Sequence, residues 1–206
     1  KNHHKDGSFG SFVIELDLMI ADGSIQRISP SNNSRLFWAT VGGMGLTGVI
    51  LNAKVHLAAI QTSKILGKNI VCKNLDELMN EMVLADDYAK YSVAWVDTLA
   101  RGKNLGRSIL SIGEHAAETD LGRKLRKAPL QYSSNQLISF PKIAFSGVIN
   151  RLTVRLFNAL WFYKAKFTKK KKLVSFDSFF YPLDGVRNWN YIYGNGGFVQ
   201  YQFSVP

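Results

Sequence analysis

The sequence predicts an α+β fold in two parts, with the division near residue 60. Apolar and polar residues alternate over 12–20, which is the period of a half-buried strand. Apolar residues at helical spacing first occur beyond the division, around 74–83 and 148–167. Charge divides the chain in the same way, since residues 1–60 carry five bases and four acids while 121–176 carry thirteen bases and no acid. We therefore expect a β-rich first part and a mixed, basic second part.

The first part is predicted to consist mainly of strands. In the strand 12–20, one face is expected to hold Phe12, Ile14, Leu16, Leu18 and Ile20, and the other Val13, Glu15, Asp17 and Met19. Asp22-Gly23 is a hairpin turn signal, and 25–28 is the expected return strand. A short helical turn over 35–40 then leads into a glycine-rich segment. The apolar, β-branched stretch 46–57 predicts a buried strand.

The second part is predicted to alternate helices and strands. Asn74 with Glu77 forms a capping-box pattern ahead of a helix. A longer helix over 148–167 places Ile149, Leu152, Leu156 and Leu160 on one face with Trp161 beside them, and Arg151, Arg155 and Asn158 on another. Strands are expected over 91–99, 108–112, 173–181 and 198–205, and a helical turn over 189–193.

Composition excludes several classes of protein. With 206 residues, 46% of them hydrophobic, the chain is long enough for a sizeable core. The single cysteine, Cys72, excludes an internal disulfide and a cysteine-based metal cluster. His3 and His4 are adjacent and would point to opposite faces of a strand, so no metal site is expected. No Ser-His-Asp set, nucleophilic cysteine or carboxylate pair is evident either.

No targeting segment is visible. No apolar stretch is long enough to cross a bilayer, and the chain opens without a secretory leader. These features and the single cysteine favour a cytoplasmic location. The chain starts at Lys1 rather than at a methionine, so we expect it to be part of a longer protein.

The densest chemical signal is the glycine segment 42–48, with glycines at 42, 43, 45 and 48. Glycines this close together let the backbone approach a phosphate or a flat ring. The segment precedes a strand rather than a helix, so it is neither a Walker A loop nor a dinucleotide-binding fingerprint. Spacing alone favours the simpler interpretation, a tight helix-to-strand turn.

Two further patterns each leave two interpretations open. Gln200 and Gln202 share one face of the last expected strand, where paired amides suit sugar hydroxyls or a flavin edge, or simply form a solvated face. The basic region 121–176 carries interleaved aromatic residues at 157, 161, 162, 163 and 167. Such a region suits an anionic membrane or nucleic acid, or else the aromatic residues belong to the core.

Several motifs together resemble a known family. The segment 36–50, LFWATVGGMGLTGVI, resembles the signature near the end of the flavin domain in FAD-linked oxidases of the vanillyl-alcohol oxidase type. Lys1-Asn2-His3-His4 followed by Gly7-Ser8-Phe9-Gly10 is similar to the entry into the second half of that domain. The motifs YSVAW (91–95), YPLD (181–184) and FVQYQF (198–203) resemble the decaprenylphosphoryl-β-D-ribose 2′-oxidase group.

The resemblance implies a domain plan and a set of site residues. Residues 1–60 would be the C-terminal part of a PCMH-type FAD-binding domain, and 61–206 an antiparallel-sheet substrate-binding domain with flanking helices, truncated at its C-terminus. FAD would be bound non-covalently, with the catalytic base beyond Pro206. Cofactor contacts are implied for Lys1, Gly43, Gly45 and Ile50, and substrate contacts for Lys1, Trp95, Gln200 and Gln202. Val93 stands where the family pattern has a small polar residue.

The implied activity is the oxidation of a secondary hydroxyl on a lipid-linked phosphosugar, with the 2′-hydroxyl of prenylphosphoryl ribose as the target. An NAD(P)-dependent reductase is the implied partner. An anionic membrane surface, as at an inner membrane, would meet Arg151, Arg155, Lys169, Lys170, Lys171 and Lys172.

The alternatives are an FAD-linked oxidase of a soluble hydroxy acid or sugar alcohol, and a non-catalytic basic module binding membranes or nucleic acid. Nucleic acid is not expected, because it leaves the glycine segment and the paired amides unexplained.

Overall fold

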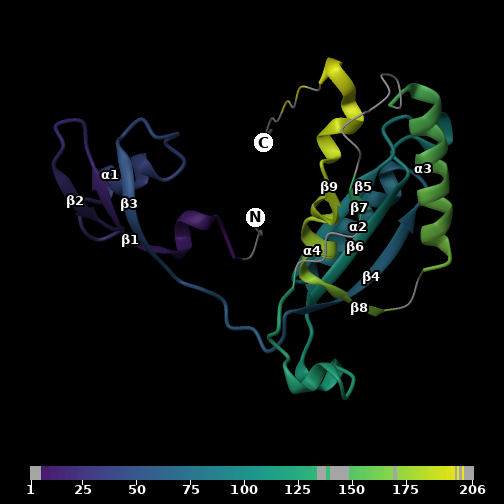
Figure 1. Ribbon diagram of the computed structural model, residues 1–206, viewed down its shortest axis with the longest axis horizontal. Helices are drawn as coiled ribbons and strands as arrows, with labels where there is room; N and C mark the ends of the chain where they lie inside the picture. The colour runs from purple at the N-terminus through teal and green to yellow at the C-terminus, as the bar shows by residue number, and fades with distance from the viewer. Residues whose placement is uncertain are drawn as a thin grey trace. The chain divides into compact units, whose positions relative to one another are not determined.

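A computed structural model describes residues 6–133, 138–139, 149–168, 171–197, 199 and 201. The chain divides into two compact units, Lys1–Ala59 and Ile60–Pro206, which are coloured purple to blue and blue to yellow in Figure 1. Antiparallel sheets and helices occur together, so the predicted α+β class is confirmed. The assignment of the two units to a flavin domain and a substrate domain stays a prediction.

The first unit is a small antiparallel sheet with one helix. Its strands lie in the order β2-β1-β3, and the elements are a 3₁₀ turn η1 (Phe9–Phe12), β1 (Val13–Met19), β2 (Ile25–Ile28), α1 (Ser34–Thr40) and β3 (Val49–Val55). The predicted hairpin turn is present, with Gly23 at φ +83° and the Ile20 N–H donating to the Ser24 carbonyl at 3.0 Å. The core of the unit consists of Val13, Leu16, Leu18, Ile28 and Phe37.

The expected alternation along β1 is wrong at its start. Val13 is 7% exposed and Ile14 is 42% exposed, the reverse of the prediction. The pairing between β1 and β3 shifts register between Val13 and Glu15. A bulge of this kind inserts one residue into the ladder and therefore exchanges the two faces of the strand on either side of it.

The prediction that 46–57 forms a buried strand is also wrong in part. A strand is present as β3, but Val49, Ile50 and Leu51 are 57%, 50% and 44% exposed. β3 lies at the edge of the sheet, and the core residues of the unit gather on β1, β2 and α1. Within the described part of this unit, no element covers these three side chains.

The second unit is built on a four-stranded antiparallel sheet in the order β5-β6-β4-β8. Its main elements are β4 (Lys64–Cys72), α2 (Leu75–Tyr88), β5 (Tyr91–Val96), β6 (Ser108–His115), α3 (Arg151–Lys166), β8 (Lys172–Ser175) and α4 (Phe176–Phe180). A parallel pair, β7 (Ile138–Ser139) with β9 (Val186–Arg187), and short 3₁₀ turns at 102–104, 118–120, 125–127, 182–185 and 189–196 complete it.

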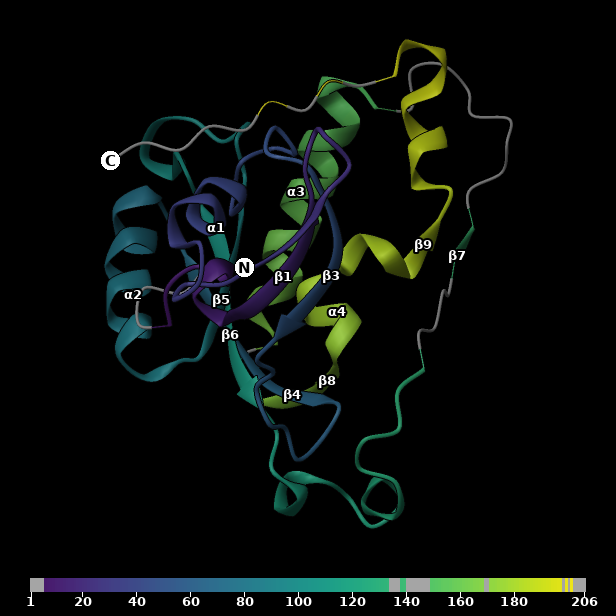
Figure 2. The ribbon, with the colours of Figure 1, turned by 90° about the vertical axis from the view of Figure 1, so that its left-hand side faces the viewer.

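The two long helices cover opposite faces of this sheet. Leu110 and Ile112 of β6 pack against Leu78 and Ala85 of α2. Ile109, their neighbour on the same strand, packs against Phe162 and Ala165 of α3. Successive side chains of a strand point to opposite faces, so α2 and α3 lie on opposite sides, as Figure 2 shows.

The start of α2 confirms the capping prediction. The Glu77 N–H donates to Asn74 Oδ1 at 2.9 Å, so the asparagine side chain caps the first turn. The Glu77 carboxylate in turn accepts from the Lys73 N–H at 2.6 Å. Both bonds satisfy backbone donors that have no partner inside the helix.

The strand predicted over 173–181 is only half correct. β8 ends at Ser175 and the chain then turns into α4, because the Ser175 hydroxyl accepts a hydrogen bond from the Ser178 N–H and caps a short helix. Phe179 of α4 packs over Gly67 and Gly113, and the missing side chain of Gly113 leaves room for the ring, since a Cβ there would lie 3.0 Å from it. The predicted helical turn at 189–193 lies within the 3₁₀ segment Trp189–Gly196. Most of the strand predicted over 198–205 lies outside the described residues.

Candidate functional site

The glycine segment forms a compact loop between α1 and β3. The Thr40 hydroxyl donates to the Leu36 carbonyl at 2.7 Å and lies 2.9 Å from the Thr47 hydroxyl, which ties the two ends of the loop together. Inside the loop, the Gly43 N–H donates to Thr40 O and the Leu46 N–H to Gly43 O, each at 3.0 Å. The loop is therefore held by its own hydrogen bonds.

The four glycines serve two different purposes. A Cβ on Gly43 would lie 2.2 Å from the Ala39 carbonyl oxygen, and one on Gly48 would lie 2.3 Å from that of Met19, so both are required by the turn itself. Gly42 and Gly45 have φ of +73° and +79°, and a Cβ on either would meet nothing within 4 Å. The space beside these two glycines is open, as the approach of a flat ring or a phosphate requires.

The surface around this open space is apolar. Met44 and Leu46 are 92% and 90% exposed, and Ile50 follows at the start of β3 with half of its surface accessible. Gly43, Gly45 and Ile50, three predicted cofactor residues, thus belong to one continuous apolar segment. The loop leaves room for a planar, partly apolar group such as a flavin ring, and the cofactor role of these residues stays a prediction. Lys1, the fourth, lies outside the described residues.

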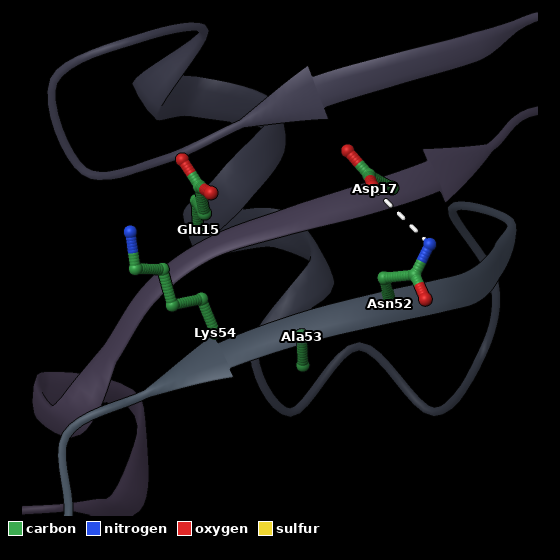
Figure 3. Close-up of a pocket in the computed structure, with 5 residues that line it drawn as sticks. All are labelled: Glu15, Asp17, Asn52, Ala53 and Lys54. Atoms are coloured by element: carbon green, nitrogen blue, oxygen red, sulfur yellow. Dashed lines mark hydrogen bonds between the residues drawn. The ribbon is translucent and has the colours of Figure 1, made fainter.

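A polar depression lies on the β1–β3 face of the same unit (Figure 3). Glu15 and Asp17 project to the same side as Asn52, and with Ala53 and Lys54 they line a volume of about 120 Å³. Asp17 accepts hydrogen bonds from Arg27 and Asn52, and the bond from Arg27 is the main cause that lowers its pKa. Ligand pockets usually measure roughly 300 Å³ or more, so this depression is too small for a flavin.

In the second unit, Trp95 is half-buried on β5, on the sheet face that α3 covers. It packs against the cluster of Ile109, Phe162 and Ala165. Val93 projects to the same face two residues earlier and pairs with Ser111 of β6. A polar group is therefore present beside the position where the family pattern has one.

That polar group has a partner on the next strand. The Ser111 hydroxyl donates to Asn69 Oδ1 of β4 at 2.9 Å. Sequence reasoning missed both residues, because their pairing depends on the register of three strands.

Sequence reasoning also missed a buried polar network at the end of β5. Asp97 is 2% exposed and its carboxylate accepts from Arg107 Nε at 2.8 Å and from Asn158 Nδ2 at 2.7 Å. The Leu99 N–H donates a third hydrogen bond at 3.1 Å. Burial raises the pKa of Asp97, but these three donors and the charge of Arg107 outweigh it, so the pKa lies below the usual value. The network ties α3 to the β5–β6 connection.

The predicted surface residues are only partly described. Arg151 and Arg155 are exposed on α3, while Lys171 and Lys172 are exposed at the start of β8. Lys169, Lys170, Gln200 and Gln202 lie outside the described residues. Among the interleaved aromatic residues, Phe162 is buried, and Phe157, Trp161, Tyr163 and Phe167 are exposed, so the core interpretation holds only for Phe162. No helix among the described residues is long and apolar enough to cross a membrane.

Comparison with known proteins adds to this geometry. Over 211 aligned residues, which include all of this chain, the sequence is 38% identical to decaprenylphosphoryl-beta-D-ribose oxidase of Mycolicibacterium smegmatis. The chain resembles this oxidase along its whole length. The predicted resemblance is thereby confirmed, and the chain spans 45% of the length of that relative.

Two other relatives match shorter parts. An uncharacterized protein of Streptomyces coelicolor is 36% identical over 152 residues, which are 74% of this chain and 40% of that protein. Cytokinin dehydrogenase 5 of Arabidopsis thaliana is 40% identical over 55 residues, which are 27% of this chain and 10% of that protein. No protein-family model matches the chain.

Proposed function

We propose that the full-length protein is an FAD-dependent oxidoreductase that oxidises the 2′-hydroxyl of a prenylphosphoryl ribose. The observation that carries this proposal is the 38% identity to decaprenylphosphoryl-ribose oxidase over the entire chain. A match of this extent includes both the glycine segment of the first unit and the strand motifs of the second. The shorter match to a cytokinin dehydrogenase supports the broader class of oxidoreductase.

In this proposal the first unit is the second half of a PCMH-type flavin domain. The open side of the loop, beside Gly42 and Gly45, would lie against the flavin, with Gly43 holding the turn and the Ile50 backbone and Lys1 completing this part of the site. FAD is bound without a covalent link and supplies a hydride acceptor. What the protein adds is binding and orientation, and the exposed side chains of Met44 and Leu46 would exclude water from this side of the site once the flavin covers them.

The second unit would position the sugar. Trp95 offers a flat apolar surface, and Gln200 and Gln202 offer amide groups that donate to and accept from sugar hydroxyls. At Val93 the small polar residue of the family pattern is missing, so one polar contact to the sugar would be lost. The nearby Ser111–Asn69 pair would supply another. We assign the base that removes the hydroxyl proton to none of the described residues.

The reaction product has a place in a two-step sequence. Oxidation of the 2′-hydroxyl removes a hydride from C2′ and gives a ketone. Delivery of a hydride to the other face of the ketone, opposite the one from which the first hydride left, gives the epimeric alcohol. The second step requires a reductant, for which an NAD(P)-dependent reductase is the proposed partner.

The test uses the purified full-length protein in an anaerobic cuvette. We expect a flavin absorption spectrum that bleaches when prenylphosphoryl ribose is added. The matched control is the 2′-deoxy analogue, which carries the same lipid and phosphate and should leave the spectrum unchanged. Bleaching by a soluble hydroxy acid or sugar alcohol alone would instead support the alternative oxidase. A protein without flavin would refute the proposal.

A further inference from the structure

Helix α3 packs one face on the sheet and has a second, apolar face that stays exposed among the described residues. The inner face consists of Asn158, Phe162 and Ala165, which are 7%, 5% and 6% exposed. Leu156 and Leu160 stand two residues before and after Asn158, so each lies about 160° around the helix from it. Together with Leu152 they form an outer apolar face, with exposed fractions between 62% and 76%. Ile149, which the helical pattern also assigned to this face, lies ahead of the N-cap Asn150 and outside the helix.

Aromatic and basic residues lie along the flanks of the outer face. Phe157 and Trp161 stack at 6.0 Å between ring centroids, and both are exposed. Lys164 Nζ lies 5.7 Å from the Trp161 ring, and Lys166 Nζ lies 4.8 Å from the ring of Tyr163. A leucine face bordered by tryptophan, tyrosine and lysine is the composition of helices that lie in a lipid interface.

The charged residues of α3 itself all have one sign. The helix contains Arg151, Arg155, Lys164 and Lys166 and no acid, and Lys171 and Lys172 follow it. Helix α2 provides an internal comparison, because it also exposes apolar residues, Met79 and Val83 among them. It contains five acids and no base, so its surface repels an anionic partner. Exposed apolar residues occur on both helices, and cationic flanks occur only on α3.

We propose that α3 lies on an anionic phospholipid membrane, with Leu152, Leu156 and Leu160 in the boundary between headgroups and acyl chains. Lys164, Lys166 and the lysines that follow α3 meet the lipid phosphates, whereas Arg151 and Arg155 lie nearer to the face that carries Asn158. The hydrogen bond between Asn158 and Asp97 holds the helix to the sheet from its inner side, so α3 presents a fixed face to the membrane. This inference goes beyond the proposed function and depends on the geometry and charge of α3, not on the presence of flavin.

The test is co-sedimentation of the full-length protein with vesicles of phosphatidylcholine alone or mixed with phosphatidylglycerol. We expect binding to the mixed vesicles, weakened by salt, and at least tenfold weaker binding after Leu156→Glu/Leu160→Glu. The matched control is Met79→Glu/Val83→Glu, which places the same two charges on α2 at the same spacing. This control should bind like the unaltered protein.

Two further measurements distinguish a loss of membrane binding from misfolding of the variant and from failure of the proposed function. Lys164→Gln/Lys166→Gln changes only exposed side chains and should weaken binding to the mixed vesicles while the melting temperature stays unchanged. Flavin content and bleaching by a short-chain, water-soluble substrate should be unaffected in all three variants.

Three results would overturn the inference. The first is equal binding to neutral and anionic vesicles, and the second is an equal loss of vesicle binding in the α2 and α3 variants. The third is a protein that self-associates and binds no lipid, and whose Leu156→Glu/Leu160→Glu variant is monomeric and also binds no lipid. Vesicle binding by a protein without flavin would refute the proposed function and leave this inference standing.

Discussion

Removal of the Asp97 carboxylate should be among the most destabilising single changes in the second unit. The Asp97→Ala variant leaves the Arg107 guanidinium, whose side chain is 17% exposed, without its 2.7 Å ion-pair partner. It also leaves the buried Asn158 amide without its acceptor. Breaking a buried ion pair by removing one partner costs about 3–5 kcal/mol. A loss of about 4 kcal/mol would lower the melting temperature by about 8–16 °C in a protein of this size.

The assay is urea unfolding of the protein followed by circular dichroism, with Glu114→Ala as the control. Glu114 is an exposed acid on β6, and its removal should change the free energy of unfolding by less than about 0.5 kcal/mol. A double-mutant cycle with Asp97→Leu and Arg107→Met should show about 1–3 kcal/mol of coupling, because each single change leaves its partner unpaired. Equal effects of Asp97→Ala and Glu114→Ala, or a cycle without coupling, would refute the reasoning.

Three further predictions concern backbone geometry, thiol reactivity and pH. Gly43→Ala should lower the melting temperature, because its Cβ would lie 2.2 Å from the Ala39 carbonyl oxygen. In the control Gly122→Ala the Cβ meets open space, so the melting temperature should change little. Equal melting temperatures of the two variants would contradict this. The Cys72 thiol is fully buried, and burial raises its pKa, so a thiol reagent should label it only in denaturant. Rapid labelling of the native protein would contradict this, because it would show that the thiol is accessible. Asp97 has a lowered pKa in the folded state, so its contribution to stability is complete above its unfolded pKa of about 3.9 and is lost as the pH falls through the folded pKa. Asp97→Asn should therefore flatten the dependence of unfolding free energy on pH below about 4, and an unchanged slope would speak against that role.

Local sequence signals predicted the features that depend on neighbouring residues. The Asn74–Glu77 cap, the turn at Gly23 and the glycine loop after α1 all form through contacts within a few residues. The resemblance to a family of oxidases was also predictable from short motifs, and the comparisons confirm it. In each case the information lies in one continuous segment.

Features that depend on distant contacts were not predictable in this way. The exchange of faces at Val13 and Ile14 follows from a bulge against β3, about forty residues away in sequence. Asn158 occupies the inner face of α3 because Asp97 accepts its hydrogen bond, and a helical pattern alone assigns a polar residue to the solvent side. The outward direction of Leu156 and Leu160 follows from this placement.

The measurement that tests the central claim most directly is anaerobic stopped-flow absorption of the full-length protein with prenylphosphoryl ribose carrying deuterium at C2′. If hydride leaves this carbon, bleaching of the flavin band should be slower than with the undeuterated substrate, and deuterium at C1′ or C3′ should have no comparable effect. Flavin that stays oxidised with this substrate, or that bleaches at a rate sensitive to deuterium at another carbon, would contradict the account.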